Sequence, residues 1–195
     1  MAEPLGKKII ATIRSVLGRC EEVGEKVGYP GEGGERRFRK PRILSPTLVR
    51  PEQLRFVLDE AGYLSDHACL MIQPTKKTER AWEDFEGKMA DIMESKLTRK
   101  ELLQYCIAFL NSSYAQQRLV RGHRPTPKGS YAITEAFMDE IPIPAPHSKK
   151  VVRKIIDLVD DLERKVFDLT KKDEVQEMEE RLQGLVTEAL AAVPA

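Results

Sequence analysis

The stretch Leu110-Asn111-Ser112, followed by Tyr131-Ala132-Ile133-Thr134 and then Ile141-Pro142-Ile143-Pro144, decides the fold of this chain. The almost continuous apolar run at 102–110 predicts a buried helix that ends at this first motif. A second short helix and a proline-containing loop follow, and the second motif is typical of a strand whose Thr134 caps another helix. The third motif predicts a proline-stiffened exit into a long helix.

Working outward to the N-terminal side, residues 42–49, 54–59 and 67–73 are short and rich in β-forming side chains, which favours strands. A turn sequence at 59–62 separates the second segment from the third, so we expect these two to form a hairpin. Residues 7–23 carry apolar side chains at helical spacing. The N-terminal 35 residues are therefore expected to form a helix and a glycine-rich loop.

Two more helices are predicted before the motif at 110–112. Residues 75–96 place apolar side chains at helical intervals among many charges, which is typical of an amphipathic helix docked on a core. Thr98 and Glu101 form a capping-box pattern that opens the buried helix. The expected fold class is therefore α+β, with a small mixed domain at 36–147 followed by a helical region at 148–195.

The C-terminal region begins at Ser148 and carries apolar side chains in steps of three and four, which predicts a coiled-coil seam. The register slips between residues 170 and 173, which favours a break between two helices over one continuous helix. A second copy of the chain could cover the seam, giving a homodimer, or the two helices could cover each other as an intrachain hairpin. The seam consists of Val152, Ile155, Val159, Leu162, Val166, Leu169, Val175, Met178, Leu182 and Leu185.

The composition limits the compartment and the chemistry. The chain has 195 residues, 41% of them hydrophobic, and no apolar run approaches the roughly 20 residues that cross a bilayer. The N-terminus does not look like a secretory signal, so we expect a cytoplasmic protein without a membrane partner. The three cysteines are far apart and show no metal-ligand spacing, so we expect reduced thiols, no metal and no cofactor.

The net charge of +1 conceals two basic segments. One holds five basic side chains within residues 36–42, and the other spans residues 118–128. Loops of this kind suit a protein with one face towards double-stranded DNA, although two solvated loops would show the same pattern. The expected DNA contacts are Arg36, Arg37, Arg39, Lys40, Arg42, Arg118, Arg121, His123, Arg124, Lys128, Ser130 and Tyr131.

Taken in order, these motifs resemble a known family of DNA-recognition domains. The matching pieces are 40–44, 56–59, 62–63, 103–112, 131–134, 141–144 and the tail at 177–190. They resemble the C-terminal specificity domain of TaqI-like adenine methyltransferases and type IIG restriction enzymes, and equally one half of a type I restriction specificity subunit. The resemblance implies sequence-specific DNA recognition within a restriction-modification system, beside a methyltransferase or nuclease subunit or module.

The chain also departs from that family. Residues 75–97 form an extra helix, and the N-terminal 35 residues match nothing in it. It has no Asn/Asp-Pro-Pro-aromatic tetrapeptide for a flipped adenine and no glycine-rich cofactor loop after a strand, so we expect no catalysis by this chain alone. Two alternatives stay open. One is a helical adaptor that docks on a partner subunit and touches DNA little, and the other is an enzyme with a hidden site.

Overall fold

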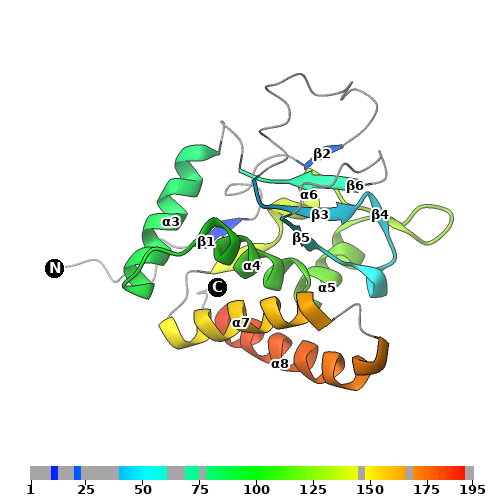
Figure 1. The fold of residues 1–195 in the computed structure, drawn as a ribbon. Coiled ribbons are helices and arrows are strands. Elements are labelled where there is room, and N and C mark those ends of the chain that lie inside the picture. The colour runs from blue at the N-terminus through cyan, green and yellow to red at the C-terminus, as the bar shows by residue number, and fades with distance from the viewer. Residues whose placement is uncertain are drawn as a thin grey trace.

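The chain folds as an α+β protein in which a small antiparallel sheet lies over one buried helix, with two long C-terminal helices beneath it (Figure 1). The residues that the computed structural model describes are 10–12, 20–22, 40–60, 69–74, 78–144, 148–165 and 169–191. Within these ranges no helix has both the length and the apolar character needed to span a membrane. The predicted fold class is confirmed.

The main sheet is antiparallel. Its strands, in spatial order, are β2 (Cys20–Glu22), β6 (Cys69–Ile72), β3 (Arg42–Pro46) and β5 (Val57–Asp59). The predicted hairpin between segments 54–59 and 67–73 is wrong, because β3 pairs with both β5 and β6 and separates them. In the centre of the sheet, β3 buries Ile43 and Ser45 completely and finds partners for its backbone on both edges.

Two shorter antiparallel ribbons complete the β structure. In one, β1 (Ile10–Thr12) pairs with β8 (Pro142–Pro144), and in the other, β4 (Leu48–Val49) pairs with β7 (Tyr131–Ala132). The helix predicted for residues 7–23 is wrong where the structure describes that segment, because β1 and β2 are strands. Both add to free strand edges, and those backbone hydrogen bonds outweigh a helical spacing of apolar residues.

The helix α4 (Arg99–Leu110) lies at the centre of the molecule, between the sheet and the C-terminal helices (Figure 1). It begins in the predicted capping box, in which the Thr98 side chain accepts from the Glu101 N–H and the Glu101 carboxylate accepts from the Thr98 N–H. Every residue from Leu102 to Leu110 is buried, as predicted. A helix that is apolar on nearly all sides needs neighbours on all sides, and the surrounding elements supply them.

Three further helices cover this centre. The predicted amphipathic helix is α3 (Glu79–Met93), which buries Trp82, Phe85, Met89 and Met93. The helix after the first motif is α5 (Ser113–Gly122), and the short 3-10 turn η2 (Pro51–Gln53) packs on it. Thr134 caps α6 (Glu135–Asp139) by accepting from the Phe137 N–H, which confirms the predicted cap.

The C-terminal region forms an intrachain pair of helices. The first is α7 (Lys149–Lys165), and the second is α8 (Lys172–Ala191), preceded by η3 (Leu169–Lys171), so the predicted break is confirmed. Both helices share one hydrophobic core with α4 and the sheet. The seam residues Val152, Ile155, Val159, Met178 and Leu182 are buried, whereas Leu162, Val175 and Leu185 are partly buried. The described seam residues are therefore covered within one chain, as in the intrachain alternative. Nothing is described of Val166 or of the Leu169 side chain.

The interior position of Cys106 gives a prediction about its reactivity. Its side chain is fully buried in α4, and burial raises the pKa of the thiol far above its ordinary value. Because the thiolate is the reactive form, we expect Cys106 to resist alkylation in the folded protein and to react fully in denaturant. Iodoacetamide labelling at pH 8, read by peptide mass spectrometry, measures this, with the partly exposed Cys69 as the reference. Equal labelling of the two thiols in the native state would contradict it.

Candidate nucleic-acid interface

One continuous part of the chain carries basic residues and contains no acid. Between Glu101 and Glu135 the sequence holds no aspartate or glutamate. This part includes α5, the loop at 123–130 and β7, which lie at one end of the molecule (Figure 1). Arg121, Arg124 and Lys128 are exposed there, and none of them forms an ion pair with another residue in the described ranges. These three cations are therefore available to an external anion.

The loop at 123–130, which we name the basic turn, has a defined shape. The Thr126 N–H donates to the Ser130 carbonyl at 2.7 Å, and the Gly129 N–H donates to the Thr126 carbonyl at 2.9 Å. Gly129 adopts a φ of 79°, a conformation that glycine reaches without steric cost. Pro125 and Pro127 restrict the backbone further. Lys128 is therefore presented from a structured turn, at a smaller entropic cost than from a free loop.

The basic turn leads into the β4–β7 ribbon, which brings in a cation that sequence reasoning missed. In this ribbon Leu48 lies opposite Ala132 and Val49 lies opposite Tyr131, so the next pair in register is Arg50 with Ser130. Arg50 is exposed and has an extended backbone. It is more than 60 residues from the basic turn in sequence, so only the strand pairing shows that the two are neighbours.

Four of the expected contacts have other roles or limited exposure. Arg118 is exposed, but its guanidinium stacks on Tyr114 of the same helix and its Nε donates to the Tyr114 hydroxyl at 2.9 Å. His123 packs edge-on against Phe137, and its Nε2 is buried without a hydrogen-bond partner in the described structure. His123 is therefore a packing residue and not one of the exposed cations. Ser130 and Tyr131 are partly buried in the turn and in the strand that follows it.

Of the first basic segment, the described residues Lys40 and Arg42 do not join this surface. Arg36, Arg37 and Arg39 lie outside the described residues. Lys40 is exposed, but it precedes β3 at the end opposite to the connection with β4. The whole length of β3, at about 3.4 Å per residue, therefore lies between Lys40 and the ribbon. The expected single positive face shared by both segments is therefore not found among the described residues.

Arg42 is corrected from a DNA contact to a structural residue. Its side chain is 1% exposed, its Nε donates to the Asp59 carboxylate at 2.8 Å, and its second terminal nitrogen lies 2.6 Å from the same oxygen. The two residues lie directly opposite each other on β3 and β5. A buried guanidinium requires a charged partner, and Asp59 meets that need inside the sheet.

The motif at 110–112 connects several elements rather than contacting a ligand. The Asn111 side chain accepts from the Phe56 N–H and donates to the Phe56 carbonyl, both at 2.8 Å, and thus imitates a strand partner just before β5. Gln183 of α8 donates to the Asn111 carbonyl and accepts from the Ser113 N–H. Ser112 caps α5. This motif therefore joins the sheet, α4, α5 and α8, and so positions the basic turn that follows α5.

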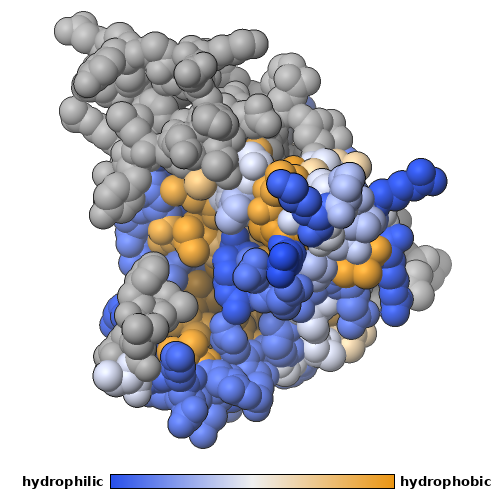
Figure 2. Space-filling view, turned by 90° about the vertical axis from the view of Figure 1, so that its right-hand side faces the viewer, coloured by the Kyte–Doolittle hydropathy of each residue, from blue (hydrophilic) through white to orange (hydrophobic). Residues whose placement is uncertain are grey.

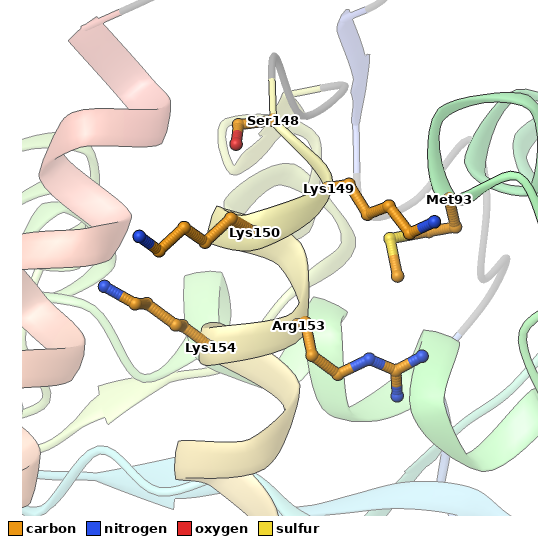
Figure 3. A pocket seen from close by; sticks show the side chains of 6 residues that line it. All are labelled: Met93, Ser148, Lys149, Lys150, Arg153 and Lys154. Carbon is orange, nitrogen blue, oxygen red and sulfur yellow. The ribbon is translucent and has the colours of Figure 1, made fainter.

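A second cationic place lies at the start of α7. A shallow pocket of about 540 Å³ is lined by Met93, Ser148, Lys149, Lys150, Arg153 and Lys154. Lys149 pairs with Glu94 and Arg153 pairs with Glu101, so half of its positive charge is neutralised. Figure 3 shows Lys150 and Lys154 extending to one side of α7, and Lys149 and Arg153 extending to the other. The four cations therefore do not converge on one anion.

Carboxylates gather between α4 and α7, where an enzymatic site could use them. Gln104 donates to both Asp160 and Glu163, and burial raises the pKa of Glu163. Lys100 forms ion pairs with Asp160 and Glu60. These contacts tie α4 to α7. The described residues hold no group of three or more His, Cys, Asp or Glu side chains that could bind a metal ion.

No family model matches this chain, and neither does any curated protein sequence. A proposal about function must therefore be based on the residues of this chain and on the surfaces that they form. We name the part of the molecule that carries Arg50, Arg121, Arg124 and Lys128 the basic end. Carboxylates border it, among them Glu52 on η2 and Glu140, which packs against Gly122. The four cations themselves are exposed. Figure 2 shows hydrophilic and apolar side chains side by side at this end of the molecule.

Proposed function

We propose that this chain binds double-stranded DNA through its basic end and reads sequence as the specificity component of a restriction-modification system. The observation that carries the proposal is the acid-free stretch from residue 102 to residue 134, which displays Arg121, Arg124 and Lys128 without ion pairs in the described structure. Arg50 on the neighbouring ribbon adds a fourth exposed cation. Exposed cations that form no ion pair in the described structure suit a polyanion.

Phosphate contacts account for most of the affinity in this proposal. Each cation that neutralises a phosphate releases condensed counterions, so affinity falls as salt rises. Four contacts from Arg50, Arg121, Arg124 and Lys128 give a slope of log affinity against log salt near −3.6, at about −0.9 per phosphate. Guanidinium groups among them can also bind guanine through two acceptors in the major groove.

The place in a restriction-modification system comes from the motif order at 110–112, 131–134 and 141–144, which forms the consecutive elements α4, α5, β7, α6 and β8. In this proposal the chain does no chemistry itself and acts in the cytoplasm beside a methyltransferase or nuclease subunit or module. A homodimer through the C-terminal seam is not part of it, because the described seam residues pack within one chain.

Reversing charge on the basic turn tests DNA binding. In the variant Arg124→Glu/Lys128→Glu we expect affinity for duplex DNA to fall at least tenfold in about 0.1 M salt. The salt slope should lose about 1.8, because two phosphate contacts disappear. Both side chains are exposed and lack ion pairs among the described residues, so the fold should persist. Fluorescence anisotropy with a labelled duplex at several salt concentrations measures both quantities.

The matched control is Arg80→Glu/Lys88→Glu on α3, which changes the net charge equally on exposed residues away from the basic end (Figure 1). It should keep the wild-type salt slope. If the two variants lose affinity equally, the effect comes from total charge and the assignment of the surface is wrong. If the wild type shows no salt-dependent binding, DNA binding itself is wrong, and a helical adaptor that docks on a partner subunit becomes the better explanation.

A further inference from the structure

The outward face of the β4–β7 ribbon combines exposed apolar side chains with hydrogen-bond donors. Leu48 is 55% exposed, unusually high for a large hydrophobic side chain, and Ala132 opposite it is exposed as well. Side chains alternate along β4, so Val49 points into the core at 4% exposure while Arg50 is exposed like Leu48. The outward face therefore carries Leu48 on β4 with Arg50 directly after that strand, and Ala132 on β7 with Ser130 directly before that strand.

The spacing of this face matches that of stacked base pairs. Residues two apart on an antiparallel strand are about 6.8 Å apart, and base pairs along DNA rise about 3.4 Å each. Leu48 and Arg50 are thus separated by the length of two base steps. Paired strands lie about 4.8 Å apart, so a two-stranded ribbon enters a major groove that is roughly 12 Å wide.

The surroundings of the ribbon distinguish Leu48 from an ordinary exposed hydrophobic residue. Leu48, Val57 and Val120 are the large hydrophobic side chains that the described residues expose. Val57 lies on β5, in the main sheet. Leu48 lies beside Arg50 and across the ribbon from the strand that follows the basic turn. Arg50 and the basic turn both lie towards the same end of the ribbon from Leu48. An apolar side chain next to a cation suits a ligand that is itself an anion with apolar groups between its charges.

We propose that the outward face of the β4–β7 ribbon reads base pairs in the major groove of DNA, with Leu48 against the 5-methyl group of thymine and Arg50 on a guanine two base steps away. This inference rests on the proposed function and adds which residues determine specificity. Thymine is the base that presents a methyl group in the major groove, and guanine presents two acceptors that match a guanidinium. The phosphate contacts then come from Arg121, Arg124 and Lys128, which hold the ribbon in place.

Replacing thymine by uracil tests this directly, because it removes the methyl group alone. Duplexes that the wild-type chain selects from a randomised pool are resynthesised with uracil at each thymine in turn. At one position we expect the wild type to bind about fivefold more weakly, and Leu48→Ala to bind the two forms equally. Arg50→Ala should lose its preference for guanine two steps from that position. Val57→Ala, which shortens an exposed apolar side chain outside the ribbon, should behave as the wild type does.

The outcomes separate this inference from the broader proposal. If the wild type binds its selected duplexes but tolerates uracil at every thymine, or if Leu48→Ala remains sensitive to uracil, the reading role of Leu48 is overturned while DNA binding stands. If the pool yields only salt-dependent binding without a preferred sequence, base reading by the ribbon is overturned in the same way. If no duplex binds, both proposals fail together.

Discussion

Replacing Asp59 with alanine is expected to lower the free energy of unfolding by about 3–5 kcal/mol, since it leaves the Arg42 guanidinium buried without its carboxylate. The two side chains are 1% and 2% exposed, so water cannot replace the lost partner. Arg42→Met is expected to cost a similar amount, because it leaves the Asp59 carboxylate buried without the guanidinium. Urea denaturation followed by circular dichroism measures the difference. It amounts to a large part of the roughly 5–15 kcal/mol that stabilises a typical domain.

The double variant Arg42→Met/Asp59→Leu distinguishes a lost charge partner from a general disturbance of the sheet. Two apolar side chains of similar size can pack against each other and leave no charged group buried without a partner. The double variant should therefore be more stable than either single variant. The control is Arg55→Met, whose partner Glu179 lies 3.5 Å away with both side chains nearly half exposed. That change should cost less than about 1 kcal/mol. Single variants that unfold no more easily than this control would show that the buried pair does not stabilise the fold.

The second large effect is expected from Asn111→Ala, which removes both hydrogen bonds to the Phe56 backbone. Phe56 is 1% exposed, so its N–H and carbonyl would lose their partner in a region from which water is largely excluded. At about 1–3 kcal/mol for each of the two polar groups left unpaired, we expect a loss of about 2–6 kcal/mol. Urea denaturation measures the loss, and hydrogen exchange at the Phe56 amide should become faster by NMR.

Asn111→Asp separates the two hydrogen bonds of that side chain. A carboxylate can still accept from the Phe56 N–H, but it cannot donate to the Phe56 carbonyl. The Asn111→Asp variant should therefore be less stable than the wild type. Gln117→Ala on the exposed side of α5 is the matched control and should change stability by less than about 0.5 kcal/mol. If Asn111→Ala matches this control, the side chain does not hold the strand, and the structural role of the motif is wrong.

The helices were largely predictable because their signals are local. The Thr98 capping box, the Thr134 cap and the apolar run at 102–110 each depend on side chains within one or two helical turns. The break before α8 was visible as a slip of the apolar register. Such signals act through nearby backbone groups, so they predict the same element wherever it is placed in the fold.

The strands were less predictable because their partners are distant in sequence. The turn at 59–62 favoured pairing between 54–59 and 67–73, yet β3 lies between those strands. The N-terminal strands were mistaken for a helix because their pairing partners β6 and β8 are roughly 50 and 130 residues away. A strand is stabilised by the strand with which it pairs, and its own residues do not specify which strand that is.

The cations of the basic end also divide into those that local sequence predicted and those whose place depends on strand pairing. Arg124 and Lys128 could be chosen from the sequence because a charged turn with two prolines is exposed almost wherever it lies. Arg121, on the last turn of α5, directly precedes that turn. Arg42 was chosen wrongly, because its burial depends on Asp59 in the neighbouring strand. Arg50 was missed, because its proximity to the basic turn depends on the pairing of β4 with β7.

By itself, then, the order of residues determined the helices that follow residue 78, the caps at which several of them begin, and which loop carries positive charge. These properties depend on interactions between residues a few positions apart. The tertiary structure decided which strands are neighbours, that the C-terminal seam is covered within one chain, and which arginines reach the surface. Those outcomes require burial and hydrogen bonding between segments tens of residues apart, and the free energy of such contacts exists only once the chain has folded.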